Sequence, residues 1–322
     1  MPKVSVIIAT YNRANYIRDA IDSVLAQTFV DYEIIVVDDG STDDTRETVA
    51  TYGDKIRYFY VEHVNQSTAL NFGIARATGE YIAFLDDDDL WLPNKLEVQV
   101  SILENNSQIG LVSSEAYQVN PDGTVLYHWG RKYHNPLSFD QLFEYNFINH
   151  SVAMARKSVI DQVLGFDQTL QTTQDYDLWL RLAKICKMDY INQPLGKIRF
   201  HPGNKHKNRN QKIKDRLYVI TKVENMAHMN YFQKRLRIAK EYYMHAEYFK
   251  NTESFLSAGK NYFKAILCYP AIGSYCVPEN APNTHLLRLY QIFRPYIQVV
   301  YWIGKGLFRK KNKQTKQNEC YK

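Results

Sequence analysis

The sequence is poor in cysteine and has no long hydrophobic run. Its four cysteines lie far apart along 322 residues, and no two are spaced like the ligands of a zinc site. This excludes a disulfide-stapled protein and favours reduced thiols in the cytosol. The chain also lacks the run of about 20 apolar residues that a membrane-spanning helix needs, and the apolar segment of a signal peptide is missing at its start. We therefore expect a cytoplasmic globular protein.

Acidic residues become scarce in the last third of the chain. Residues 1–200 contain 17 Lys and Arg against 27 Asp and Glu, whereas residues 201–322 contain 23 against 7. A basic region of this kind favours an anionic partner, such as membrane lipid or an anionic glycan. The alternative is a solvated basic tail without a partner. No nucleic-acid-binding motif accompanies the charge, so nucleic acid is not an expected partner.

Short apolar strands alternate with helical patterns along the first 110 residues. The expected strands are Val4–Thr10, Glu33–Val37, Arg57–Glu62 and Tyr81–Leu85. The expected helices are Ala14–Ala26, a helix from Ser41 through Ala50 and Thr68–Ala77. Ser41 and Asp44 fit a capping box that would open the second helix. Strands and helices in this alternation predict an α/β fold with a mainly parallel sheet flanked by helices.

Polar clusters follow three of these strands, at Thr10-Tyr11, Asp38-Asp39 and Asp86–Asp89. Ligands of such sheets bind outside the carboxyl ends of the strands, so the clusters should converge on one edge. Four consecutive aspartates repel one another unless a cation offsets their charge. Their hard oxygen ligands suit Mg²⁺ or Mn²⁺. The alternative is an acidic turn that caps the next helix.

Three stretches in this order resemble glycosyltransferase family 2: Val4–Asn12, Val36–Asp43 and Gly79–Asp89. The resemblance covers about residues 3–202. It implies the Rossmann-like GT-A fold in residues 1–204, with a nucleotide-sugar half at 1–110 and an acceptor half at 111–204. Residues 205–322 would then form a basic, aromatic-rich C-terminal helical extension.

The resemblance also implies roles for residues at the strand ends. Thr10 and Tyr11 would line the nucleotide pocket, and Asp39 would accept a hydrogen bond from the uracil N3–H. Asp86 and Asp88 stand where the family has its DxD motif. Asp88 would bind the metal directly, and Asp86 would lie near the ribose and the metal shell.

A later segment, Gln174–Leu182, resembles the family stretch whose second residue is the catalytic base of inverting members. Asp175 is therefore the expected base, which would take the proton of the acceptor hydroxyl. The alternative role for Asp175 is an N-cap of the following helix. Gln174 departs from the family pattern, where Glu is usual, and so does Gln66, where Gly is common.

Two further segments match the family near the end of the expected catalytic domain. Arg199 could reach the pyrophosphate, and His201 the metal or the diphosphate, although a lone histidine is more often structural. Asn149–Ser151 falls where the acceptor pocket is expected.

The basic C-terminal region admits two interpretations. Residues 286–322 interleave aromatic and basic side chains, which is typical of a segment that lies in an anionic membrane surface without spanning it. The alternative is a helix packed on the protein's own core. The membrane interpretation would place the protein peripherally on the inner face of the cell membrane.

Together these features predict an inverting, metal-assisted glycosyltransferase. It would move a sugar from a UDP-sugar to a glycan or lipid-linked acceptor. The alternative is a catalytically silent, nucleotide-sugar-binding or membrane-associated scaffold protein. The sequence has no Gln-x-x-Arg-Trp motif of a processive polysaccharide synthase.

Overall fold

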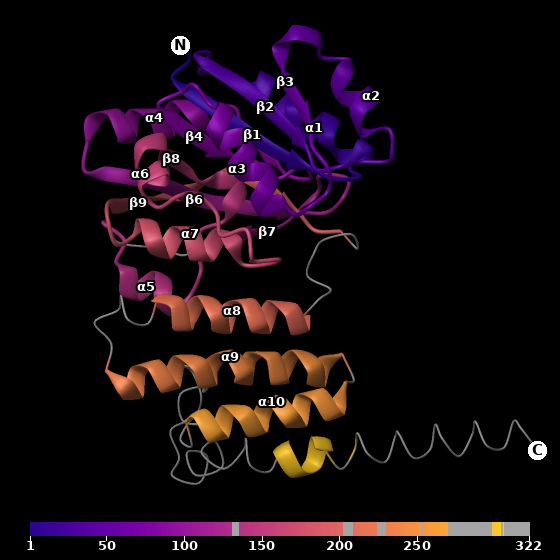
Figure 1. Ribbon diagram of the computed structural model, residues 1–322, viewed down its shortest axis with the longest axis vertical. Coiled ribbons are helices and arrows are strands. Elements are labelled where there is room, and N and C mark those ends of the chain that lie inside the picture. Colours follow the sequence, from indigo (N-terminus) through magenta and orange to yellow (C-terminus); the bar gives the residue numbers. More distant parts are fainter. Residues whose placement is uncertain are drawn as a thin grey trace, which may run out of the picture. The chain divides into compact units, whose positions relative to one another are not determined.

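The computed structural model describes residues 1–130, 135–201, 209–223, 230–252, 254–269, 298–303 and 305. The chain forms two compact units, Met1–Lys207 and Asn208–Lys322. The first unit contains every described strand, and the second is helical (Figure 1).

Strands and helices alternate through the first unit. Its strands are β1 (Val4–Thr10), β2 (Tyr32–Asp38), β3 (Arg57–Tyr60), β4 (Tyr81–Phe84), β5 (Leu90–Trp91), β6 (Ile109–Val119), β7 (Val125–Trp129), β8 (Met154–Arg156) and β9 (Lys187–Arg199). Its α-helices are α1 (Ala14–Leu25), α2 (Thr45–Ala50), α3 (Gln66–Arg76), α4 (Lys95–Asn105), α5 (Phe139–Glu144), α6 (Lys157–Gln162) and α7 (Gln174–Leu182). Two short 3₁₀ turns lie at Gly53–Lys55 and His150–Val152.

These strands form one sheet in the order β3-β2-β1-β4-β8-β6-β9-β5, and β7 pairs with β6. The half β3-β2-β1-β4 is parallel throughout. In the other half β6 and β9 pair in parallel, and the remaining pairs are antiparallel. The parallel half aligns the carboxyl ends of β2, β1 and β4, as the sequence predicted.

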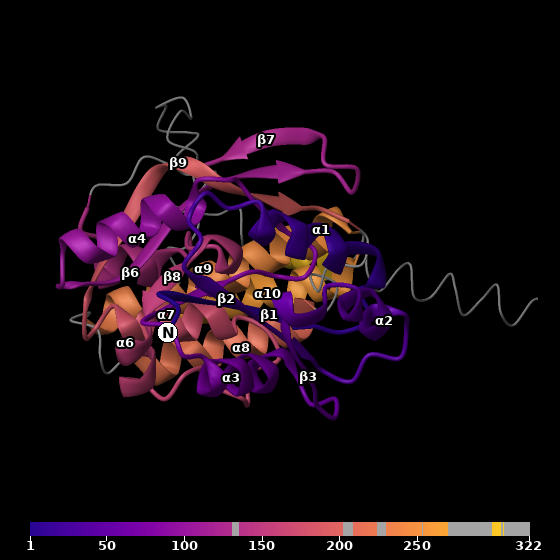
Figure 2. The same cartoon turned by 90° about the horizontal axis from the view of Figure 1, so that it is seen from above.

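Helices cover both faces of the parallel half, with α1 and α4 on one face and α3 on the other (Figure 2). The α3 face allows close approach because Gly73 has no side chain: a Cβ there would lie 2.8 Å from Ile7 Cγ2. The helices therefore bury the apolar strands from both sides.

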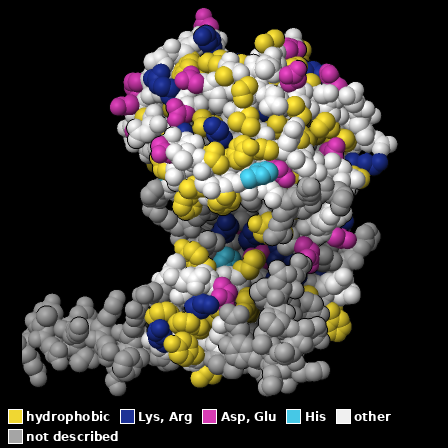
Figure 3. All heavy atoms as spheres, turned by 180° about the vertical axis from the view of Figure 1, so that it is seen from behind, with side chains coloured by type: hydrophobic (Ala, Val, Ile, Leu, Met, Phe, Trp, Pro, Cys, Tyr) yellow, Lys and Arg dark blue, Asp and Glu magenta, His cyan; other side chains and the backbone are white. Residues whose placement is uncertain are grey.

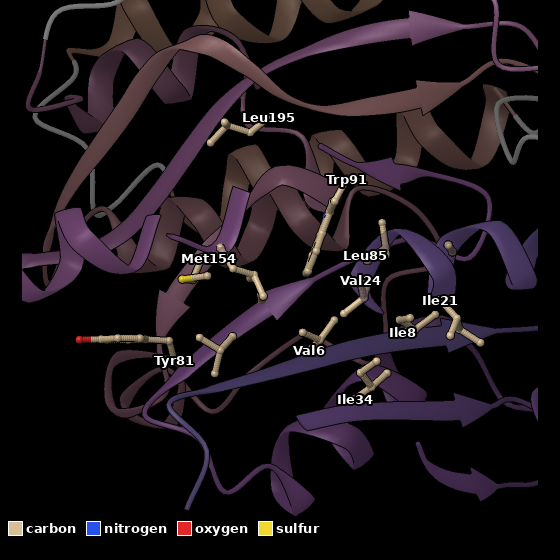
Figure 4. Close-up of a cluster of buried hydrophobic side chains, with 14 of the residues drawn as sticks. Val6, Ile8, Ile21, Val24, Ile34, Tyr81, Leu85, Trp91, Met154 and Leu195 are labelled. Atoms are coloured by element: carbon tan, nitrogen blue, oxygen red, sulfur yellow. The ribbon is translucent and has the colours of Figure 1, made fainter. Parts of the chain in front are cut away.

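Alternating side chains of the strands form the core under α1 and α4. Val6, Ile8 and Ile34 lie in one buried cluster with Ile21 and Val24 of α1 (Figure 4). All seven residues of β1 are buried, which accounts for its largely apolar sequence. Burial of such side chains is worth about 1.5–3 kcal/mol each, so this cluster anchors the loops at the strand ends.

The predicted capping box at Ser41 is wrong. Helix α2 begins at Thr45, its N-cap position is Asp44, and no side chain caps it. Ser41 instead accepts a hydrogen bond from Asn12 N at 2.9 Å, and its own N–H donates to Asp38 Oδ1 at 2.7 Å. The loops after β1 and β2 therefore hold each other, and this tertiary contact replaces the local cap.

The second unit consists of helices α8 (Arg209–Val223), α9 (Tyr231–Asn251) and α10 (Phe255–Cys268), and residues 298–303 are helical as well. Helix α9 ends at Asn251 and helix α10 begins at Phe255. Tyr243, Phe249 and Tyr262 lie in the hydrophobic core of the second unit. Among the described residues, none of the helices combines the length and the apolar character needed to cross a bilayer.

Candidate active site

The polar clusters after β1, β2 and β4 meet at one edge of the sheet. Asp39 N donates to Thr10 O at 2.8 Å, and Tyr11 N donates to Asp87 Oδ2 at 3.3 Å. Arg13 Nε lies 3.6 Å from the other oxygen of Asp87. Thr10 itself is buried at the end of β1. The three strand ends thus form one continuous polar surface.

Three of the four consecutive aspartates are buried: Asp87, Asp88 and Asp89. Burial and the neighbouring charge of Asp88 raise the pKa of Asp87 to about 7, although its hydrogen bond with Thr10 opposes the shift. The same two causes raise the pKa of Asp89 well above its ordinary value. Burial and mutual repulsion therefore disfavour the ionised forms of these carboxyl groups, and a cation at this edge would offset the repulsion.

Asp88 meets His201, which follows β9. His201 Nε2 lies 2.9 Å from Asp88 Oδ2, and His201 is buried. A carboxylate oxygen and an imidazole nitrogen form a donor set that Mn²⁺ accepts. Within the described ranges, no three His, Cys, Asp or Glu side chains gather into a metal-binding group. A two-ligand site fits a divalent ion that completes its shell with phosphate and water, so Asp88 and His201 fit the expected metal.

Asp39 and Tyr11 both contact His63, a residue that the sequence analysis did not select. The His63 ring stacks on the Tyr11 ring with centroids 4.1 Å apart. His63 Nδ1 lies 3.0 Å from Asp39 Oδ2, and Val64 N donates to Asp39 Oδ1 at 3.0 Å. Since His63 follows β3 by three residues, its place after a strand end was the available signal.

Asp86 lies at the centre of a set of side-chain hydrogen bonds. Its Oδ1 accepts from Gln66 Nε2 at 2.9 Å, and Gln66 Oε1 accepts from Gln174 Nε2 at 3.0 Å. On its other side, Asp86 N donates to Ser151 Oγ at 3.1 Å. The aspartate run, α3 and the start of α7 are therefore connected through single side chains.

Asp175 lies in the first turn of α7 and is partly exposed. Its Oδ2 accepts from Asn146 Nδ2 at 3.1 Å, a partner that the sequence analysis missed. The N-cap position belongs to Thr173, so Asp175 does not occupy the alternative capping position. Two residues further on, Asp177 pairs with Arg181 of the same helix at 2.7 Å. Arg181 also donates to Val163 O and Gly165 O, which fixes the helix against the loop before it.

Ser151 and His150 lie against the aspartates rather than apart from them. The Ser151 hydroxyl is 2.5 Å from Asp89 Oδ2 and 3.3 Å from Asp86 Oδ2. His150 Nε2 is 4.0 Å from Asp86 Oδ1, and its ring packs near Phe84 with centroids 4.9 Å apart. The segment predicted to lie at the acceptor pocket thus forms one wall of this edge.

Arg199 is held mainly by other parts of the protein. Its backbone N–H donates to Asp89 Oδ1 at 2.8 Å, and its guanidinium donates to Asp19 Oδ2 of α1 at 2.9 Å. The side chain is only 3% exposed. Arg199 therefore connects β9, α1 and the aspartate run, and its predicted contact with a pyrophosphate stays a prediction.

Comparison with known proteins places this geometry in context. The model of glycosyl transferase family 2 matches residues 5–164. An uncharacterized glycosyltransferase of Methanocaldococcus jannaschii, MJ1057, is 33% identical over 232 residues, which is 69% of this chain and 79% of that protein. An uncharacterized glycosyltransferase of Rickettsia bellii is 38% identical over 215 residues, covering 62% of this chain. The matches span less than two thirds of the first curated relatives, 30% of one and 64% of the next.

Among solved structures, S. aureus TarS 1-349 in complex with UDP-GlcNAc is similar with a TM-score of 0.65. The match covers 96% of this chain and 92% of that one at 16% identity. At this sequence identity, the structural similarity shows a shared fold and nothing about function. The α/β sheet with C-terminal helices is accordingly a GT-A fold, as the sequence predicted.

Proposed function

This chain belongs to glycosyl transferase family 2, and on that premise we propose that it transfers a sugar from a UDP-sugar to a hydroxyl of a glycan or lipid-linked acceptor. Inversion at the anomeric carbon and assistance by a divalent metal are parts of the proposal. A fold neighbour in complex with UDP-GlcNAc supports the choice of nucleotide.

One observation carries the proposal: the expected nucleotide, metal and base residues meet at a single edge of the sheet. The loop of Asp39 contacts the end of β1, and the end of β1 contacts the aspartate run. Gln66 bridges Asp86 to Gln174, the residue before Asp175. A base and a donor site must be this close for an acceptor oxygen to reach the anomeric carbon.

In the proposed reaction, the Asp175 carboxylate takes the proton of the acceptor hydroxyl while its oxygen attacks the anomeric carbon. A new carbon–oxygen bond forms as the bond to the UDP oxygen breaks, and UDP leaves with the electron pair. Asp88 and His201 would hold the metal, which offsets the charge on the departing diphosphate when bound. Asn146 orients the base through its hydrogen bond to Asp175.

The test is UDP release from a panel of UDP-sugars in the presence of Mn²⁺, with glycan and lipid-linked acceptors supplied in turn. Acceptor-dependent UDP release from at least one donor supports the proposal. A protein that binds UDP-sugars but releases no UDP with any acceptor is instead the silent scaffold considered above. Exchange of UDP-sugars for GDP-sugars is the control for nucleotide choice.

For the partner of the second unit we propose an anionic membrane surface. The predicted segment 286–322 lies outside the described residues except for 298–303 and 305. Within it, Trp302 stacks on Phe255 of α10 with centroids 4.9 Å apart, so this side chain packs on the protein itself.

The exposed face of α10 carries the features of a membrane-contacting helix. Lys260, Phe263, Lys264 and Leu267 are all exposed and recur at the spacing of one helical face. Phe263 is 50% exposed and Leu267 is 61% exposed. Hydrophobic and basic side chains also lie side by side on the described surface of this unit (Figure 3). Two lysines beside two apolar side chains suit contact with anionic lipid.

A further inference from the structure

Two glutamines connect the Asp86 carboxylate with the helix that carries Asp175. Gln174 stands at the first position of α7 and Gln66 at the first position of α3, 108 residues apart in the chain. Gln174 Nε2 donates to Gln66 Oε1 at 3.0 Å, and Gln66 Nε2 donates to Asp86 Oδ1 at 2.9 Å. We call these three side chains the amide relay.

The carboxylate sets the orientation of both amides. A carboxylate oxygen accepts hydrogen bonds, and Gln66 presents its NH₂ group to Asp86 Oδ1. The carbonyl oxygen of Gln66 then faces Gln174, which must in turn present its own NH₂ group. A carboxylate at position 174 would place an acceptor against the Gln66 carbonyl oxygen, and the relay would break.

This arrangement carries a local cost in folding free energy. The orientation leaves Gln174 Oε1 buried and without a hydrogen-bond partner in the described part of the chain. Such an acceptor costs free energy. Thr173, directly before it, adopts φ +59°, an uncommon conformation for a β-branched residue. Strain and an unpaired acceptor at two adjacent positions are typical of a functional constraint.

We propose that Gln66 and Gln174 are positioning residues that set the distance between the Asp86 carboxylate and the base helix α7. This inference rests on the proposed function, because it concerns the donor and base sides of the same site. Gln66 and Gln174 are also two of the positions at which the sequence departs from the family pattern.

The test is a double-mutant cycle with Q66G, Q174E and the double variant. In the presence of Gln66, Q174E lowers kcat about 10-fold or more and weakens UDP-sugar binding, because the new carboxylate faces a carbonyl oxygen. In the Q66G background, Q174E lowers kcat and the affinity for UDP-sugar by less than about threefold each, because the Gln66 carbonyl oxygen is absent. Affinity for UDP without a sugar and the Tm stay close to wild type in all variants that retain the fold.

The relay is overturned if the fold-change of the double variant, in kcat and in UDP-sugar Kd, equals the product of the fold-changes of Q66G and Q174E. The two glutamines would then act independently. If Q66G lowers the Tm, Q66A replaces it in the same cycle. Q162E is the matched control, because exposed Gln162 on α6 receives the same chemical change. If the wild-type protein transfers no sugar, the proposed function is contradicted. The relay can still be tested in that case, because the double-mutant cycle on UDP-sugar Kd measures binding and needs no turnover.

Discussion

At the residue scale, the carboxylates at the carboxyl edge of the sheet differ in their environments. Asp87, Asp88 and Asp89 are buried, and burial together with mutual repulsion raises the pKa values of Asp87 and Asp89. Asp175 is partly exposed and accepts a side-chain hydrogen bond from Asn146. This division suits a buried metal site beside a base that an acceptor can reach.

Replacement of Asp175 by Asn should abolish most of the transfer. The amide is close to isosteric with the carboxylate but cannot take a proton, so kcat should fall about 10²–10⁴-fold. Affinity for UDP should stay within about twofold of wild type, because the base does not contact the nucleotide in the proposed mechanism. Steady-state kinetics and calorimetric titration measure the two quantities. D161N on the exposed side of α6 is the control, and retained turnover in D175N would remove Asp175 as the base.

Replacement of Asp88 by Asn should make the affinity for UDP independent of the divalent metal. Wild-type protein is expected to bind UDP about 10-fold or more tightly with Mn²⁺ than with EDTA, and D88N should lose this difference. H201A should lose part of it, since His201 contacts Asp88 at 2.9 Å. Titration of UDP with and without Mn²⁺ measures the effect, and D54N at an exposed position is the control. Equal UDP affinity in Mn²⁺ and EDTA for the wild type contradicts the metal role.

At the scale of elements, one side chain of β2 ties the parallel strands together. Glu33 accepts from Ser5 of β1 at 2.7 Å and from Thr78, before β4, at 2.8 Å through its backbone N–H. It also forms an ion pair with Arg57 of β3. Burial alone would raise the pKa of Glu33, but these hydrogen bonds outweigh it and lower the pKa to about 2.

The lowered pKa predicts an acid-dependent stability. Because the folded pKa lies below the ordinary value of 4.5, the stabilisation is complete above pH 4.5 and disappears as the pH falls towards 2. E33Q should therefore lower the free energy of unfolding by about 1–2 kcal/mol at pH 7. The difference from wild type should shrink at pH 3. Urea unfolding at both pH values measures it, with exposed E62Q as the control. A deficit that is equal at both pH values contradicts the ionic explanation.

At the scale of the whole molecule, charge is divided between the two parts of the chain. Residues 1–200 carry a net charge of −10 and residues 201–322 a net charge of +16. Within the basic part, the described helix α10 exposes two lysines and two apolar side chains on one face. This combination of charge and exposed apolar surface is what an anionic bilayer would bind.

Charge reversal of Lys260 and Lys264 should release the protein from anionic membranes. Each lysine near such a surface contributes about 1 kcal/mol, so K260E/K264E should reduce binding about 10-fold or more. Flotation with vesicles of phosphatidylglycerol and phosphatidylcholine measures it, and vesicles of phosphatidylcholine alone should bind neither protein. K55E/K184E, at exposed lysines of the first unit, makes the same change in net charge and should bind like wild type. Undiminished binding of K260E/K264E removes α10 from the membrane surface.

The sequence by itself determined the α/β class, the strands of the parallel half and the family. Hydrophobic periodicity and the residues after strand ends are local properties, and parallel strands bring their carboxyl ends to one edge by topology alone. Ser41 shows where local rules fail, because its side chain and backbone bond to the loop after β1 and to Asp38 rather than to α2.

Only the tertiary structure decided which polar side chains meet across that edge. Gln66 and Gln174, Asp88 and His201, and Ser151 and Asp89 are separated by 108, 113 and 62 residues. No periodicity relates residues so far apart, because their contacts depend on how α3, α7 and β9 pack around β4. For the same reason, only the structure shows that His63 contacts Tyr11 and that Asn146 donates to Asp175. Composition and motifs therefore located the aspartates, whereas packing of distant elements determined their partners and pKa values.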